Sequence, residues 1–165
     1  FKSRSIQLFM LRVIMDANIY GKIIDDTNIS EDLSESIRRD NEFQVHNFRV
    51  VRNELRKIPE LIELYDKITT NRIITVNDEI EKLASGYYSE YKKNGGVQTD
   101  NQNFMNDLLI VACASIKGFD IIVSDDEKTM KNPIAIDSYD KINLLRNLRT
   151  PTFISYKNLR HKYLS

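Results

Sequence analysis

Short apolar runs alternate with stretches of helical periodicity along the chain, and this alternation constrains the fold more than any other feature. Segment 48–58, FRVVRNELRKI, has apolar residues at i, i+3, i+7 and i+10, the spacing of one helix face. Segment 104–118, FMNDLLIVACASIKG, is apolar on nearly all sides and predicts a buried helix closed by Gly118. Strands rich in β-branched and aromatic residues are predicted at 11–15, 43–47, 72–76, 119–124 and 150–156.

Helical patterns fill the segments between these strands. They predict helices at 19–24, 30–40 with Ser30 as N-cap, 48–58, 60–70, 79–93 after Asn77 or Asp78, 104–118, 125–130, 139–148 and 157–164. Strands that alternate with helices predict an α/β protein, a three-layer α/β/α sandwich around a mostly parallel central sheet. Residues 10–165 are expected to form one domain, and residues 1–9 an N-terminal extension.

Composition narrows the classes of function. Lys plus Arg and Asp plus Glu are balanced at 24 each in 165 residues, which excludes a strongly basic nucleic-acid binder of the histone kind. The single cysteine, Cys113, cannot form an intramolecular disulfide, so a reducing, cytoplasmic compartment is expected. With one cysteine and two histidines, a Cys/His zinc site is not expected, and a metal would be held by oxygen atoms.

The N-terminal apolar stretch LFMLRVIM does not predict a membrane segment. It contains Arg12 and falls well short of the roughly 20 apolar residues that a membrane-spanning helix needs. It also lacks the small-residue cleavage site of a signal peptide. No association with a membrane is therefore expected.

Acidic residues follow two of the predicted strands. Asp16 comes directly after the strand at 11–15, and Asp125 and Asp126 come after the strand at 119–124. Aspartate at such positions is often only a turn former or a helix cap. In a parallel sheet, however, ligands bind beyond the carboxyl ends of the strands, so these side chains also lie where a site would form.

Asp107 is the acid that a purely structural role explains least well. It lies on the predicted buried helix, where an unpaired ionised carboxylate costs several kcal/mol. Asn103 and Asp100 share its helix face, so this face is expected to meet a polar site. Glu54 lies beside the apolar stripe of the helix at 48–58, a position that also suits an ordinary surface glutamate.

Carboxylates from separate segments that gather at one sheet end require cations. Two unit charges about 4 Å apart repel by roughly 4 kcal/mol at an effective dielectric constant near 20. Mg²⁺ or Mn²⁺ is the natural counter-ion for such a cluster, and carboxylate-bound Mg²⁺ is typical of phosphoryl transfer.

Three segments, VIMDANIYG, VVRNEL and NDLLIVACASIKGFDIIVSDD, resemble in their order and spacing the PIN domain (PilT N-terminus) nucleases. The resemblance spans about Arg12 to Asp126. It implies a VapC-like or stand-alone prokaryotic PIN protein, although the long charged region between Ile19 and Asn47 departs from the compact toxin members. A role in a toxin–antitoxin pair and a role in RNA processing both stay open.

The resemblance also implies a set of site residues. It assigns the metal-binding and catalytic acids to Asp16, Glu54, Asp107 and Asp126, with Asp125 second to Asp126 as a metal ligand. Asn18, Ser124 and Asn103 are the expected supporting residues. Cations near these acids are expected to hold substrate phosphates: Arg52 first, then Arg49, Arg56 and Lys128.

The implied activity is that of an endoribonuclease that uses Mg²⁺ or Mn²⁺ and cuts single-stranded RNA by attack of a metal-activated water. Two alternatives stay open: a PIN-fold RNA-binding or scaffold protein that does not cleave, and a metal-dependent phosphatase on small phosphoesters. The implied partners are RNA, an antitoxin or an RNA-processing protein, and a second copy in a homodimer.

Overall fold

A four-stranded parallel sheet forms the centre of the molecule. The structure, a computed structural model, describes residues 10–97 and 102–164. The strands lie in the order β2 (Phe43–Val45), β1 (Leu11–Met15), β5 (Ile121–Val123) and β6 (Thr152–Ile154), and all adjacent pairs are parallel. A second parallel pair joins β3 (Asn47–Phe48) to β4 (Ile73–Ile74).

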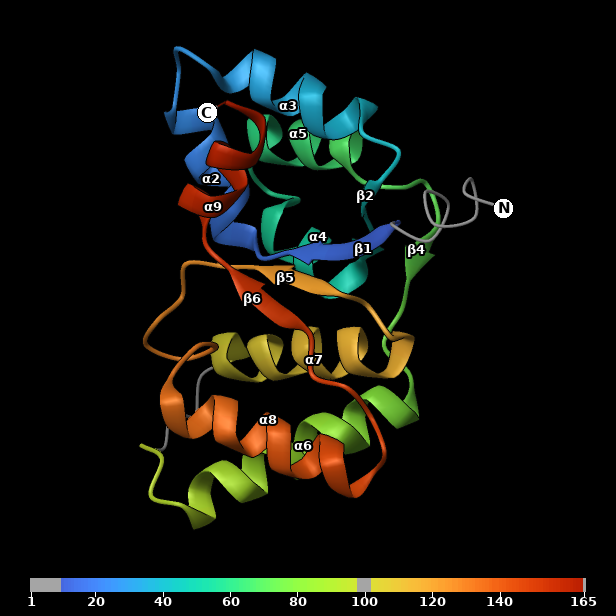
Figure 1. Cartoon of the computed structure of the whole chain (residues 1–165), viewed down its shortest axis with the longest axis vertical. Coiled ribbons are helices and arrows are strands. Elements are labelled where there is room, and N and C mark those ends of the chain that lie inside the picture. The colour runs from blue at the N-terminus through green and yellow to red at the C-terminus, as the bar shows by residue number, and fades with distance from the viewer. Residues whose placement is uncertain (1–9, 98–101, 165) are drawn as a thin grey trace, which may run out of the picture.

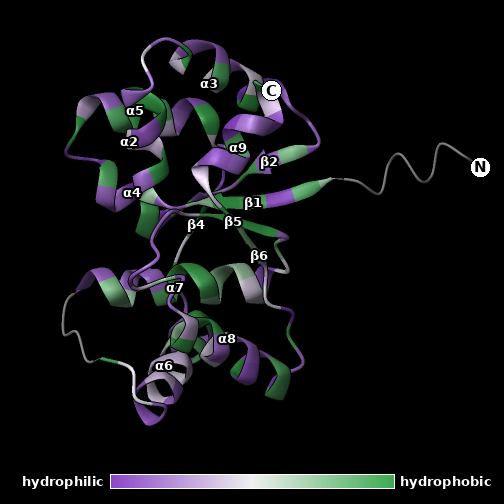
Figure 2. Cartoon of the chain, turned by 60° about the vertical axis from the view of Figure 1, so that its left-hand side comes forward, coloured by the Kyte–Doolittle hydropathy of each residue, from purple (hydrophilic) through white to green (hydrophobic). Residues whose placement is uncertain are grey.

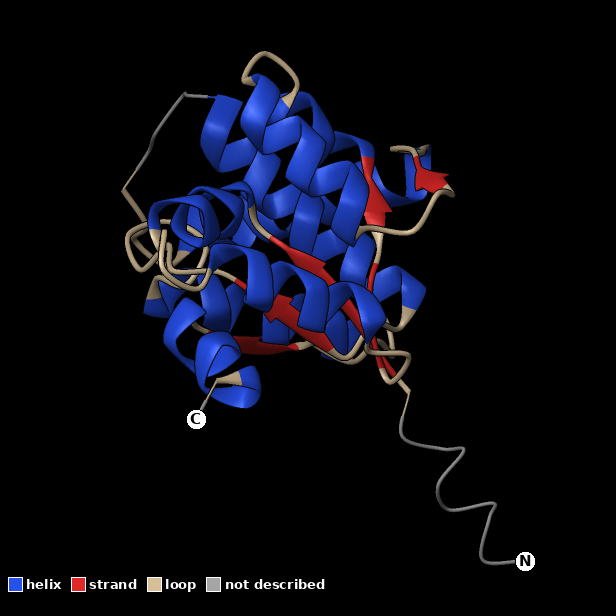
Figure 3. Cartoon of the chain, turned by 90° about the horizontal axis from the view of Figure 1, so that it is seen from above, coloured by secondary structure: helices blue, strands red, loops and turns tan. Residues whose placement is uncertain are grey.

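Helices cover both faces of the sheet (Figures 1 and 3). One layer holds α2 (Ala17–Asp25), α3 (Ser30–Arg39), α5 (Pro59–Ile68) and α9 (Tyr156–Tyr163), and the other holds α6 (Asp78–Lys93), α7 (Gln102–Lys117) and α8 (Pro133–Leu145). Helix α4 (Arg49–Leu55) contacts α5 of the first layer and α7 of the second. The predicted three-layer α/β/α architecture is confirmed.

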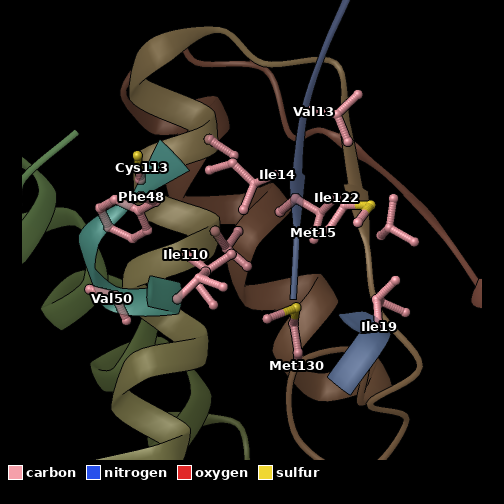
Figure 4. Packing of buried hydrophobic residues seen from close by; sticks show 14 of the residues in the cluster. Val13, Ile14, Met15, Ile19, Phe48, Val50, Ile110, Cys113, Ile122 and Met130 are labelled. Carbon is pink, nitrogen blue, oxygen red and sulfur yellow. The ribbon is translucent and has the colours of Figure 1, made fainter. Parts of the chain in front are cut away.

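The central strands are buried on both faces because each is covered by a helical layer. Val13, Ile14 and Met15 are at most 1% exposed, and the strands are largely hydrophobic in Figure 2. Their side chains alternate: Ile14 points to the side where α7 carries Ile110 and Cys113, and Val13 points to the opposite side (Figure 4). Of the described part of the chain, no helix combines the length and apolar character needed to cross a membrane.

Some local predictions were wrong, and the helix predicted at 139–148 is part of α8, which already begins at Pro133 and ends at Leu145. The segment after β5 does not begin a helix at 125–130: residues 127–131 form turns, and α8 begins only at Pro133 with Asn132 as N-cap. The Asp126 carboxylate accepts hydrogen bonds from the amides of Lys128 and Thr129, but Asn132, the residue before Pro133, has φ −58° and ψ 137°, outside the helical region, so the turns do not continue as one helix. Ser30 is the first residue of α3, and the N-cap is Ile29, which makes no side-chain capping bond.

Candidate metal centre

The strand order reverses between β1 and β5, so the topological switch point of the sheet lies at the carboxyl ends of these two strands. From the central strand β1 the chain continues to β2 on one side, and it returns to β5 on the other. The amide of Asp16 donates a 2.8 Å hydrogen bond to the carbonyl of Val123, so the two strand ends are joined. In doubly wound sheets, ligands bind at such a switch point.

Asp16 is held at this switch point by hydrogen bonds to both of its carboxylate oxygen atoms. It is the N-cap of α2, and its Oδ1 accepts a 2.8 Å hydrogen bond from the amide of Ala17. Its Oδ2 accepts a 2.8 Å bond from the Ser124 hydroxyl. Burial raises the pKa of Asp16, against the opposing effect of these two hydrogen bonds.

Asp107 approaches Asp16 from the second layer of helices. It lies on α7 and is 7% exposed, and its Oδ2 accepts a 2.6 Å hydrogen bond from the Thr129 hydroxyl. Burial, joined by the charges of Asp16 and Asp126, raises the pKa of Asp107 to about 9. Without a cation, this carboxyl group therefore holds a proton at neutral pH.

Asp126 completes the group from the loop after β5. Its Oδ1 accepts hydrogen bonds from the amides of Thr129 (3.0 Å) and Lys128 (3.2 Å), and its Oδ2 accepts one from the Thr129 hydroxyl. Burial alone would raise the pKa of Asp126, but these hydrogen bonds outweigh burial and hold the pKa below its ordinary value. Because the single hydroxyl proton of Thr129 faces both Asp107 and Asp126, it cannot serve both carboxylates at once.

Asp16, Asp107 and Asp126 each offer one oxygen atom, and these three atoms lie within 4.8 Å of one another. Asp16 and Asp107 are buried, and Asp126 is half-buried. Three hard oxygen donors at this spacing fit Mg²⁺ or Mn²⁺, which prefer carboxylate and water ligands. The pKa shifts of Asp107 and Asp126 have opposite directions because burial dominates at Asp107 and hydrogen bonds dominate at Asp126; the charges of Asp16 and Asp126 add to the rise at Asp107.

Glu54 lies outside this group of three. Its side chain on α4 is exposed, yet the protein around the carboxyl group and the charge of Asp16 raise its pKa to about 7. Glu54 is thus close enough to Asp16 to sense its charge, but it does not join the oxygen cluster of the described residues.

The neighbours of the centre are arranged in different ways. The Ser124 hydroxyl contacts Asp16 and accepts a 3.1 Å hydrogen bond from the Asp126 amide. The Asp125 carboxylate points elsewhere, to the Lys22 ammonium and to the Tyr156 amide at 2.8 Å. Asn18 is exposed in the first turn of α2, and Asn103 is exposed one turn before Asp107. Asp100 lies outside the described residues.

The predicted substrate-binding cations differ in whether they are paired with an acidic residue. Arg52 forms a two-pronged ion pair with Asp66, with nitrogen–oxygen distances of 3.1 and 2.9 Å. Arg49, Arg56 and Lys128 are exposed, and none of them makes an ion pair with a residue in the described ranges. Arg49 and Arg52 line one polar groove together with Asn47, Asp66 and Asn71.

Sequence reasoning did not identify Thr129 or Lys22 as part of this site. The local signal for Thr129 is its position three residues after Asp126. At this distance the Asp126 carboxylate can accept hydrogen bonds from both the amide and the hydroxyl of Thr129. Lys131, which follows the two aspartates, is mostly buried, and its ammonium donates a 3.0 Å hydrogen bond to the Ser124 carbonyl.

Comparisons with known proteins agree with the fold. No family model matches the sequence, and no curated protein matches it either. Among solved structures, a chain in the crystal structure of VapBC2 from Rickettsia felis bound to a DNA fragment from their promoter superposes with a TM-score of 0.51. The match has 12% sequence identity and covers 88% of this chain and 98% of that chain, so it supports a shared fold.

Proposed function

We propose that this protein is a Mg²⁺- or Mn²⁺-dependent nuclease of the PIN type, an endoribonuclease that hydrolyses phosphodiester bonds of single-stranded RNA. The observation that carries the proposal is the group of three aspartate oxygens within 4.8 Å of one another at the switch point of the sheet. Carboxylate clusters of this kind bind the cations used in phosphoryl transfer.

Asp16, Asp107 and Asp126 would hold one cation or its water ligands, and Glu54 would hold a second cation or the attacking water. A divalent cation in such a site lowers the pKa of a bound water and stabilises negative charge on phosphate oxygens. The products expected from hydrolysis by water are a 5′-phosphate and a 3′-hydroxyl, without a covalent protein intermediate.

The chain's own residues prepare this chemistry. The Ser124 hydroxyl orients Asp16, and the Thr129 amide and hydroxyl orient Asp126. Glu54, with a pKa of about 7, is suited to accept or release a proton near neutral pH, which is the requirement for general acid–base catalysis.

On the substrate side, the exposed cations Arg49, Arg56 and Lys128 are the proposed phosphate-binding residues. Arg52 ranks below them, because Asp66 already neutralises its guanidinium group. The fold similarity to a chain of the VapBC2 complex favours an antitoxin as the protein partner. A second copy in a homodimer and a cytoplasmic location complete the proposal, the latter because the single cysteine forms no disulfide within the chain.

The test is cleavage of a 5′-labelled, mixed-sequence single-stranded RNA with Mn²⁺, by wild type and by Asp107→Asn in parallel. We expect metal-dependent cutting by wild type that the variant loses. Equal cutting by both would place the activity elsewhere. RNA binding without cutting by either would favour a scaffold protein, and hydrolysis of an aryl phosphate in place of RNA would favour a phosphatase.

A further inference from the structure

The adjacent residues Asp125 and Asp126 have different partners. Asp126 belongs to the group of three aspartates, whereas Asp125 is bound by two elements distant in sequence. Lys22 approaches it from α2, and the Tyr156 amide, the first of α9, donates a 2.8 Å hydrogen bond to its Oδ1. Through Asp125, the loop that carries Asp126 is therefore attached to helices α2 and α9.

Helix α9 is in turn fastened to the first helical layer by polar contacts. Asp26 accepts hydrogen bonds from the Tyr156 hydroxyl (2.8 Å) and from Nε of Arg160 (2.9 Å). At the other end of the helix, Asp40 accepts a 2.7 Å bond from the Tyr163 hydroxyl. Leu159 is the buried apolar residue of the helix. Tyr156 and Tyr163 also pack against the hydrophobic core, so both polar and apolar contacts set the position of α9.

A backbone amide at the start of a helix differs from a side chain as a partner for Asp125. A side chain can rotate to follow a moving loop, but the amide can move only with the helix. A metal centre requires its ligands to be held within about 0.5 Å of their working positions, and residues beyond the ligands supply this precision. The Tyr156 amide is placed to do so for the loop that carries Asp126.

We propose that Asp125, bound to the Tyr156 amide and to Lys22, is a positioning residue for Asp126, so that the docking of α9 sets the affinity of the centre for its cation. This inference rests on the proposed function in one respect, namely that the three aspartates bind a divalent metal. It answers why two adjacent aspartates follow β5: one faces the centre, and the other holds the loop in place.

A proline at position 156 tests the amide alone. Tyr156→Pro removes the N–H group, and proline is well tolerated at the first position of a helix. Ser155 before it is already extended, with φ −90° and ψ 169°, as a residue before proline prefers. The matched control is Tyr156→Ala, which keeps the amide and, like proline, lacks the phenol ring and hydroxyl.

The measurement is isothermal titration of the full chain with MnCl₂, after thermal melting in EDTA has shown that each variant is folded. We expect Tyr156→Pro to bind Mn²⁺ about tenfold to 100-fold more weakly than Tyr156→Ala, the range expected when a residue that supports a metal ligand is lost. Equal affinity of the two variants would overturn the inference and leave the proposed nuclease intact. A wild type that binds no Mn²⁺ would overturn both.

A second variant serves if Tyr156→Pro does not fold. Lys22→Met combined with Asp125→Leu removes both members of the Lys22–Asp125 ion pair. The net charge of the protein stays the same, so the long-range attraction for the cation is preserved. We expect weaker Mn²⁺ binding by this double variant. Wild-type affinity in a folded double variant would also overturn the inference.

Discussion

The Ser124 hydroxyl lies 2.8 Å from Oδ2 of Asp16 and joins the loops that follow two neighbouring parallel strands. The hydroxyl oxygen of Ser124 also accepts a hydrogen bond from the Asp126 amide. One buried hydroxyl group therefore contacts two of the three clustered aspartates. Its loss should affect both the stability of the fold and the geometry of the metal centre.

Ser124→Ala is therefore expected to lower the free energy of unfolding by about 1–2 kcal/mol, as urea denaturation in EDTA would measure. We also expect weaker Mn²⁺ binding. The matched control is Ser115→Ala, which removes an equally buried hydroxyl from the contact between α6, α7 and α8. The control should lose stability but keep its affinity for Mn²⁺. An equal loss of affinity in both variants would contradict a specific role of Ser124.

Asp107→Asn is expected to stabilise the metal-free protein while it abolishes activity. At pH 7 the unfolded chain ionises Asp107, whereas the folded chain must keep it protonated at a cost in free energy. Asparagine avoids that cost, so the free energy of unfolding in EDTA should rise by about 2 kcal/mol or more. RNA cleavage should fall by at least about 100-fold, because a first ligand matters more than the outer residues whose loss costs 10–100-fold. Asp137→Asn, at an exposed site on α8, should change neither quantity.

The stability of the metal-free protein should fall as pH rises from about 4 to about 9. The folded pKa of Asp107 is raised to about 9, so its contribution is fully present below the unfolded value of 3.8 and is lost as pH rises toward 9. Glu54 adds the same trend up to about pH 7. Urea denaturation of wild type and Asp107→Asn at several pH values would isolate the first contribution. Parallel curves for the two proteins would show that Asp107 is ionised in the folded state.

Mn²⁺ should raise the melting temperature of wild type. At 100 times its dissociation constant, a ligand that binds only the folded state adds about 2.7 kcal/mol, or about 5–10 °C for a domain of this size. Differential scanning fluorimetry with MnCl₂ and then excess EDTA would measure the shift and its reversal. Asp107→Asn should show a smaller shift. Equal shifts in the two proteins would place the metal away from the three aspartates.

Arg49→Ala should weaken the binding of single-stranded RNA. It should also make the affinity for RNA less dependent on salt concentration. If Arg49 contacts one phosphate, its removal lowers the slope of log affinity against log salt concentration by about 0.7. Fluorescence anisotropy in an Asp107→Asn background would measure this slope without cleavage. Arg52→Ala is the comparison, and we expect a smaller change because Asp66 neutralises Arg52. An unchanged slope for Arg49→Ala would remove it from the substrate path.

The layers of the fold and the three clustered aspartates were predictable because their signals are local. An apolar run that ends in an aspartate indicates both the strand and the position of the carboxylate at its end, as at Asp16. After β5 this signal marks Asp125 and Asp126 alike, and only the family resemblance ranked Asp126 first. Asp107 was recognisable because an acid is costly on an apolar helix. Each of these signals lies within a few residues of the side chain that it concerns.

The rest depends on contacts between distant segments or on competition within a turn. Nothing near Asp125 in the sequence indicates that Lys22 and Tyr156 bind it, since they are 103 and 31 residues away. Arg52 looked like a free cation because Asp66 approaches it only after α5 packs against α4. The segment after Asp126 has the composition of a helix start, but Pro133 keeps Asn132 out of the helical conformation and lacks an amide donor, so a helix begins only at Pro133.

The pairing of β1 with β5 joins Val13 to Ile121 across most of the described chain. Contacts between residues so distant in sequence close large loops and therefore form slowly during folding. The three aspartates cannot meet before these two strands pair. A chain in which β1 and β5 have not paired consequently lacks the centre, and the RNA cleavage proposed for the protein becomes available only after this pairing.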